Sequence, residues 1–327
     1  MISLRSFFSS KQAGVVKLLP LLTTLIVIVA VGCVSCAGRA DQDGEGNVVY
    51  TIQVNSDTEG EAFGPVQFQF GNAYLSEHQY AEAVRAYTTA INNGYTDINV
   101  YINRGIAYMA LEQYAGAISD ANVSLDMNNA EIRAYRLRGQ AYLKTGKYQD
   151  AVADFSSAIA LDKSNKEDYL GRGMAYTGIS EYDMAAHDFD QAILIDPGYP
   201  DAYYWRAHLN GKYRQDYSSA LNDYAKVIDL NGKYVYDAYN GCGETYYKLN
   251  DFDRAISEFS VLLTLKPDYW LAYYNRGLCY AGTRQYQQAV SDFKQYLALD
   301  TNNKYGRVQS ADYLVSSYKP FVEGNVR

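Results

Sequence analysis

The chain has 327 residues, of which 48% are hydrophobic and 20% are charged, a composition that excludes a disordered protein and a length that exceeds one ordinary domain. Its formal net charge is −8, and −11 remains once the three cationic residues of positions 1–36 are set aside. Phosphate backbones repel a body this acidic, and the sequence contains no basic stripe, so nucleic acid is excluded as a partner.

The first predicted element is an export segment over residues 1–36. Residues 1–17 carry three positive charges and no negative one, and the stretch from Leu18 to Val31 is uncharged and mostly apolar. Signal peptides have this order of a basic and then an apolar region. The apolar stretch is shorter than the ~20 residues of a transmembrane helix. Extending it to Gly38 keeps a signal anchor as the alternative.

The apolar stretch ends in Ala30-Val31-Gly32-Cys33, which resembles a bacterial lipobox. The resemblance implies lipidation at Cys33, with Cys36 as a second candidate, and a plain signal peptide is the alternative. We therefore expect an exported protein on the periplasmic side of a bacterial cell envelope, held there by its lipid, with a signal-anchored or secreted form as alternatives. Residues 37–65 are acidic and Gly-rich, which predicts a flexible linker.

Residues 66–302 repeat with a period of about 34 residues, which is the sequence signal of a solenoid. In most repeats a small residue has a tyrosine four positions before it and another three positions after it. An alanine column and then an aromatic column follow in nearly every repeat. The column of small residues comprises Gly71, Gly105, Gly139, Gly173, Ala207, Gly243 and Gly277.

The spacing within one repeat predicts a hairpin of two antiparallel helices. In the third repeat, Gly139 falls opposite Ala151 and Tyr135 falls opposite Phe155 if the hairpin turns near 145–146. Small residues that face each other let the two helices approach closely. A single hairpin is too small to bury its apolar face, so we expect the hairpins to stack.

The four columns resemble the tetratricopeptide repeat, with tyrosine in place of its first tryptophan. Together with the lipobox, the chain resembles a bacterial tetratricopeptide repeat lipoprotein. The resemblance implies an all-α fold, a right-handed superhelical solenoid of about seven helix hairpins over residues 66–302. The apolar pattern of 304–318 predicts a capping helix within the C-terminal segment 303–327, and we expect Pro320 to end it.

One column departs from the family pattern, because arginine stands before the glycine where the family usually has leucine. Each arginine has an aspartate 16 or 17 positions later, which the hairpin brings to a nearly facing position. The sequence therefore predicts a row of ion pairs, here called the arginine row. Its pairs are Arg104–Asp120, Arg138–Asp154, Arg172–Asp188, Arg206–Asp223 and Arg276–Asp292, and the sixth repeat has Cys242 and Glu258 instead.

The family resemblance implies that the first helix of each repeat lines a concave groove that binds partner peptides. The candidate groove residues are Asn72, Ile102, Arg136, Gln140, Met174, Tyr204, His208, Asn240 and Tyr274, with a modest basic spot at Arg133, Arg136 and Lys144. Their mixed character favours an amphipathic or extended apolar peptide. The alternative is that these residues pack between repeats. The Lys and Asn arrangement that clamps chaperone tails in some family members is not found.

The sequence predicts no catalytic site, metal or cofactor. The three histidines lie in different repeats without metal-ligand spacing, and Cys242 and Cys279 either pair or serve as small core residues. We therefore expect a non-catalytic protein–protein interaction scaffold with proteins or peptides as partners. The alternative is a structural subunit of an envelope or secretion complex, docked through the solenoid edge or the cap. The oligomeric state stays open.

Overall fold

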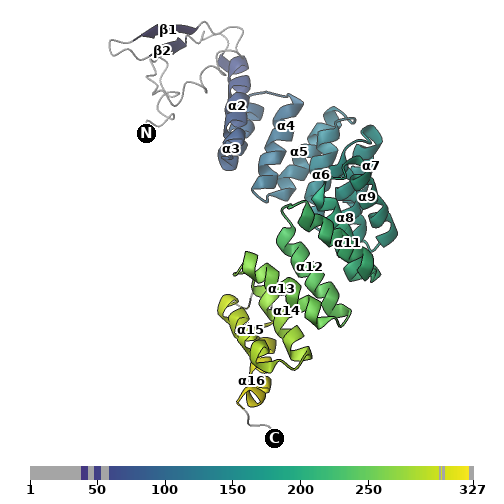
Figure 1. Ribbon diagram of the computed structural model, residues 1–327. Coiled ribbons are helices and arrows are strands. Elements are labelled where there is room, and N and C mark those ends of the chain that lie inside the picture. The colour runs from purple at the N-terminus through teal and green to yellow at the C-terminus, as the bar shows by residue number, and fades with distance from the viewer. Residues whose placement is uncertain (1–37, 43–47, 53–58, 302, 304–305, 324–327) are drawn as a thin grey trace. The chain divides into compact units, whose positions relative to one another are not determined.

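The computed structural model describes residues 38–42, 48–52, 59–301, 303 and 306–323 (Figure 1), and for both strands and residues 59–62 the description is of the backbone. The described residues form 15 α-helices, one π-helical turn and one two-stranded sheet. The predicted Cys33 and Cys36 lie outside the described residues. No helix in the described part is both long and apolar enough to span a membrane.

The chain divides into two compact units, residues 1–161 and 162–327. In the first unit, strand β1 (Gly38–Gln42) pairs antiparallel with β2 (Val48–Ile52), and Gly38 lies opposite Ile52. The sequence of β2, VVYTI, is rich in β-branched and aromatic residues, which favour strands. The range 37–65, expected to be a linker, thus contains both strands and the first turns of the next helix. This strand pair was not predicted.

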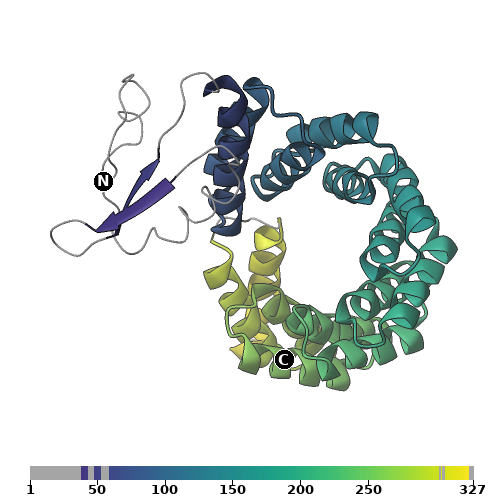
Figure 2. The ribbon, with the colours of Figure 1, turned by 90° about the horizontal axis from the view of Figure 1, so that it is seen from above.

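Three helix hairpins follow in the first unit. They are α2 (Glu59–Ser76) with α3 (Tyr80–Asn92), α4 (Ile98–Ala110) with α5 (Tyr114–Met127), and α6 (Ile132–Lys144) with α7 (Tyr148–Leu161). The two helices of each hairpin lie side by side (Figure 2).

Four hairpins and a last helix form the second unit. The hairpins are α8 (Lys166–Gly178) with α9 (Tyr182–Ile195), α10 (Pro200–Leu209) with α11 (Tyr217–Asp229), α12 (Val235–Lys248) with α13 (Phe252–Leu265), and α14 (Trp270–Gly282) with α15 (Tyr286–Leu299). The π-helical turn η4 (Asn210–Arg214) continues α10, and α16 (Val308–Val322) ends the unit. The prediction of an all-α array of about seven hairpins and a capping helix is confirmed.

The core of each hairpin is built from the columns of the repeat. All seven residues of the alanine column are fully buried. A Cβ added to Gly243 would lie 2.5 Å from the ring of Phe259, and one added to Gly173 would lie 2.6 Å from that of Phe189. The glycine is therefore needed because the aromatic ring of the second helix covers it directly.

Apolar side chains also join consecutive hairpins. Leu262 of α13 packs in one buried cluster with Ala272 and Cys279 of α14. This contact buries surface that a lone hairpin would expose, as expected for stacked repeats.

The capping helix lies against the last hairpin, because the ring of Tyr286 in α15 stacks on Tyr318 at 5.1 Å and contacts Phe321 at 4.7 Å. The prediction that Pro320 ends this helix is wrong, since α16 continues to Val322. A proline removes one backbone hydrogen bond and crowds the preceding turn. In the last turn few further hydrogen bonds depend on that position, so the helix runs two residues past it.

Candidate interaction surface

The arginine row exists as predicted. In the third repeat, Nε and Nη2 of Arg138 donate to Oδ2 and Oδ1 of Asp154 at 2.8 and 2.7 Å. The other four pairs have the same two-bond geometry. The Asp154 side chain is 5% exposed, and the hydrogen bond to it raises the pKa of Arg138. These ion pairs are structural, so the row does not present free guanidinium groups for acidic ligands.

A second contact of the row was not predicted. Nη1 of Arg138 donates to Oδ1 of Asn122 at 2.6 Å, and Nη1 of Arg276 donates to Oγ of Ser260 at 2.9 Å. Arg104 contacts Thr88 in the same way. Each acceptor lies in the second helix of the preceding hairpin, one position after the aromatic column. The arginine therefore links consecutive hairpins, and polar residues recurring at that position were the signal that the sequence analysis missed.

The sixth repeat breaks the row. Cys242 is buried with a free thiol, and burial raises its pKa to about 12, helped by the nearby charge of Glu258. Burial also raises the pKa of Glu258, and no cationic side chain of the described residues pairs with it. Ala225 occupies the position of the acceptor in the preceding hairpin. The sixth repeat therefore lacks both the arginine and its acceptor in the preceding hairpin, but it keeps an acidic residue at the aspartate position.

In the first unit, the first helix of each hairpin carries part of the predicted groove. Oδ1 of Asn72 accepts hydrogen bonds from Tyr87 of α3 and Asn103 of α4, both at 2.8 Å, so it joins three helices. Ile102 is 1% exposed and packs in the core, which removes it from the surface. Arg136 is half-buried and Gln140 is exposed.

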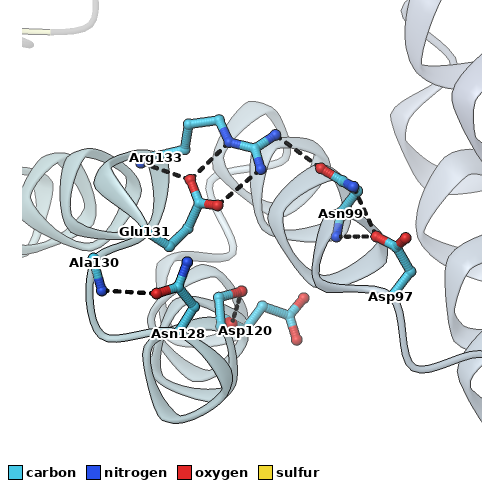
Figure 3. Close-up of polar contacts among 8 residues, drawn as sticks. Asp97, Asn99, Asp120, Asn128, Ala130, Glu131 and Arg133 are labelled. Carbon is cyan, nitrogen blue, oxygen red and sulfur yellow. Dashed lines mark hydrogen bonds and ion pairs between the residues drawn. The ribbon is translucent and has the colours of Figure 1, made fainter.

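The expected basic spot in the first unit is partly neutralised (Figure 3). Nε and Nη2 of Arg133 donate to the two carboxylate oxygens of Glu131 at 2.8 and 2.9 Å, and Nη1 donates to Asn99 at 2.9 Å. Asn99 in turn donates through its backbone N–H and side chain to Asp97, the residue before α4. Arg133 therefore ties the starts of α4 and α6 together.

In the second unit, aromatic groups line α10, which is the first helix of the fifth repeat. The ring of Tyr204 stacks on Tyr234 with centroids 4.2 Å apart, and burial raises the pKa of Tyr204. His208 lies one turn further on, and burial together with Lys212 and Lys248 lowers its pKa to about 4. It is neutral at pH 7, so it offers hydrogen bonding rather than charge.

A carboxylate held by two amides lies on α12 and α14. Nδ2 of Asn240 and Nδ2 of Asn275 donate to Oε1 of Glu244 at 3.0 and 3.1 Å, and Asn275 also approaches Oδ1 of Asn240 at 3.3 Å. We call these three residues the Glu244 cluster. Asn240 is buried, whereas Glu244 is exposed. Asn275 was not among the predicted residues, although Asn103 stands at the equivalent position of the second repeat.

The remaining predicted groove residues are more covered. Met174 is half-buried and packs with Phe189 and Leu209. Tyr274 packs against Tyr296 at 5.3 Å, and the guanidinium of Arg307 lies 5.0 Å from the Tyr274 ring centroid. The structure thus brings Asn240 together with Glu244, while Met174 and Tyr274 serve mainly in packing.

The fold and its surface define the class of protein. The described part contains no cluster of three or more His, Cys, Asp or Glu side chains that could hold a metal ion. It is an array of helix hairpins whose charged row is paired internally and whose first helices carry fixed polar and aromatic groups at the surface. This is the construction of a protein-interaction scaffold.

The family follows from comparison with known proteins. Three family models, each described as tetratricopeptide repeat, match residues 68–132 with 212–269, 132–165 and 243–311. The chain is a tetratricopeptide repeat protein.

Solved structures share the fold. A tetratricopeptide repeat protein from Parabacteroides merdae superposes with a TM-score of 0.60 at 17% identity, covering 78% of this chain and 98% of that one. The C-terminal part of a repeat protein from Cytophaga hutchinsonii gives 0.58 at 19% identity, covering 75% and 98%. At these identities the likeness concerns the fold alone.

A curated relative matches a short stretch. The chloroplastic tetratricopeptide repeat domain-containing protein PYG7 of Arabidopsis thaliana is 32% identical over 69 residues, which are 21% of this chain and 23% of the relative. The match spans less than a quarter of the relative's length.

Proposed function

We propose that the chain binds partner proteins through the exposed face of its first helices, centred in the second unit on the Glu244 cluster. The observation that carries this proposal is the exposed Glu244 carboxylate, which two amides from two helices hold in place. A fixed acceptor of this kind gives orientation to a bound peptide at a small entropic cost. The partner segment supplies an N–H donor to Glu244 and an apolar group toward Tyr204.

The charge of Glu244 reaches the neighbouring aromatic groups. Burial and then the charge of Asp237 raise the pKa of Tyr204 and of Tyr269, and Glu244 makes the smallest contribution to each. An acceptor beside half-buried rings suits a peptide that is polar on one side and apolar on the other, which supports the predicted amphipathic partner.

A single substitution tests this surface. Full-length protein is retrieved from native membranes as wild type, as Glu244→Gln and as the control Glu181→Gln, an exposed glutamate before α9. We expect at least one partner whose recovery falls tenfold with Glu244→Gln and is unchanged with Glu181→Gln. Identical recovery from all three proteins would contradict the proposal.

We also propose that the scaffold is tethered on the exported side of a bacterial membrane through a lipid on Cys33, with Cys36 as the alternative. The basic and apolar regions of residues 1–31 and the lipobox-like Ala30-Val31-Gly32-Cys33 support it. Mass spectrometry of the mature N-terminus is the test. A lipid-modified Cys33 is expected, whereas an unmodified cleaved end or an intact residue 1–36 segment would refute lipidation.

A second candidate function is that of an assembly subunit docked through the cap. On α16, Tyr313 is 71% exposed and Phe321 is 50% exposed, an unusual exposure for large apolar rings. Under this alternative, Tyr313→Ser with Phe321→Ser releases the protein from a large native complex, while Glu244→Gln leaves the complex intact. Under the first function, the two variants give the opposite results.

A further inference from the structure

The fifth repeat is longer than its neighbours. Ala207 and Ala220 are 13 positions apart, whereas Gly173 and Ala185 of the fourth repeat are 12 apart. The extra residue is accommodated by the π-helical turn η4, followed by Gln215 with φ of 56°, in the left-handed region. A π-helical turn costs hydrogen-bond geometry, and such insertions in helices are frequent at functional sites.

The inserted turn borders a pocket of about 400 Å³ between α9, α10, η4 and α11, here called the η4 pocket. This volume lies at the small end of the range for ligand pockets, which is about 300–1,000 Å³. Its lining residues are Ala186, Asp190, Arg206, Asn210, Arg214, Asp216, Ser219, Asn222 and Asp223.

One lining residue has a buried polar group without a partner. Asn210 is 5% exposed, and its Oδ1 accepts no hydrogen bond from any group of the described residues. Its backbone C=O is used, because it accepts from the N–H of Asp216 at 3.0 Å. Buried amide oxygens are nearly always paired with protein or with ordered water, so this one is open to a donor from outside the chain.

The charges of the pocket favour a cation. Nε and Nη2 of Arg206 are both bonded to Asp223, and its Nη1 donates to Oδ1 of Asp190 at 2.5 Å, so this guanidinium is satisfied. Oδ2 of Asp190 has no hydrogen-bond donor among the described residues, and its side chain is 56% exposed at the rim. With two arginines and three aspartates, the lining has a formal charge of −1.

The lining presents acceptors from three elements, beside the donors of Arg206, Arg214, Ser219 and Asn222. Asp190 is on α9, Asn210 is in η4, and Asp216 precedes α11, where it accepts from the N–H of Ser219 at 3.2 Å. The Arg214 side chain is 40% exposed, and its Nη2 lies 3.4 Å from Oδ1 of Asp183. A planar group with several donors can satisfy acceptors on three sides at once, and a guanidinium is such a group.

We propose that the η4 pocket binds an arginine side chain of a partner protein. This site is separate from the first-helix face, because its lining comes mainly from the second helices α9 and α11 and from the inserted turn. The net negative charge of the chain attracts basic segments of partner proteins toward the η4 pocket at low ionic strength.

The test uses the full-length protein and a capped peptide, acetyl-Gly-Gly-Arg-Gly-Gly-amide, against the same peptide with citrulline, which keeps the shape and loses the charge. Isothermal titration is expected to show saturable binding of the arginine peptide and at least tenfold weaker binding of the citrulline peptide. Equal binding of both peptides, or no saturable binding, would overturn the proposal.

Three variants locate the site. Asp190→Asn keeps the hydrogen bond to Arg206 but removes the rim charge, so it is expected to weaken binding at least fivefold. Arg214→Gln removes the more exposed of the two lining cations, so it is expected to strengthen binding. Glu112→Gln, at an exposed glutamate of the first unit, is expected to have no effect, and each variant is checked by thermal melting. An unchanged affinity in Asp190→Asn, at an unchanged melting temperature, would refute the η4 pocket as the binding site.

Discussion

Arg138 holds both carboxylate oxygens of Asp154 in a pair that is largely withdrawn from solvent, with side-chain exposures of 22% and 5%. The same guanidinium reaches the preceding hairpin through Asn122. One side chain therefore fixes the geometry within a hairpin and the spacing between two hairpins.

Removing one member of this pair leaves a buried charge without its counter-charge. Arg138→Leu or Asp154→Leu is expected to lower the free energy of unfolding by about 3 kcal/mol, and the double change is expected to cost less than the two single changes added together. Urea unfolding measures all four proteins. Arg85→Leu, which breaks an exposed pair with Glu82, is the control and is expected to cost less than about 1 kcal/mol. Harmless single changes at Arg138 and Asp154 would show that the row does not stabilise the array.

The sixth repeat can be completed by substitution. Cys242→Arg places a guanidinium near the Glu258 carboxylate, and we expect it to raise the free energy of unfolding by about 1 kcal/mol, because charged hydrogen bonds contribute more than neutral ones. The gain is expected to disappear in a Glu258→Gln background. A gain of equal size in both backgrounds would mean that the arginine stabilises by packing alone.

The Glu258 carboxyl itself gives a pH-dependent prediction. Burial raises its pKa in the folded state, so the protonated form is favoured by folding and stability falls as pH rises through that raised value. Glu258→Gln is therefore expected to stabilise the protein at pH 7 and to have little effect near pH 4, where the unfolded carboxyl is also largely protonated. Thermal melts of both proteins across this range are the measurement. A pH-independent difference would contradict this account.

His208 predicts a trend of the opposite sign. Its pKa is lowered to about 4, so between pH 6.5 and 4 the unfolded chain binds a proton that the folded chain does not, and stability falls with falling pH. The contribution is as much as about 3 kcal/mol, and His208→Gln is expected to remove it from the pH profile of unfolding. The control His187→Gln, at a side chain that is 62% exposed, leaves the profile in place.

The turns within the hairpins carry strain that can be relieved. Glu112 has φ of 58° in the second repeat, whereas Gly146 fills the same turn position in the third repeat with φ of 73°. Left-handed backbone costs a non-glycine residue about 1–2 kcal/mol. Glu112→Gly is expected to raise the melting temperature and Gly146→Ala to lower it. The same sign for both changes would rule out backbone strain as the cause.

Periodic features of this chain could be predicted from its sequence. The hairpins recur about every 34 residues, and the Arg–Asp pairing of Arg138 with Asp154 recurs in five of the seven repeats, so several repeats give independent support for the same arrangement. The acceptor Asn122 shares this period but varies in residue type among repeats, which hid it.

Single events could not be predicted in the same way. Three features each occur once: the strand β2, the continuation of α16 past Pro320 and the turn η4. Each depends on local interactions that a periodic sequence pattern does not indicate. Ile102 shows a further limit, because positions on one helix face differ in burial according to how closely the next hairpin packs.

The interruption of the arginine row at Cys242 has a mechanical consequence. Pulling on the second unit loads the contacts between its hairpins in series, and the step from α11 to α12 lacks the guanidinium bridge that Arg206 and Arg276 supply at the steps from α9 to α10 and from α13 to α14. Of these three steps, we expect this one to separate first under tension, which would keep the hairpins on either side of it intact.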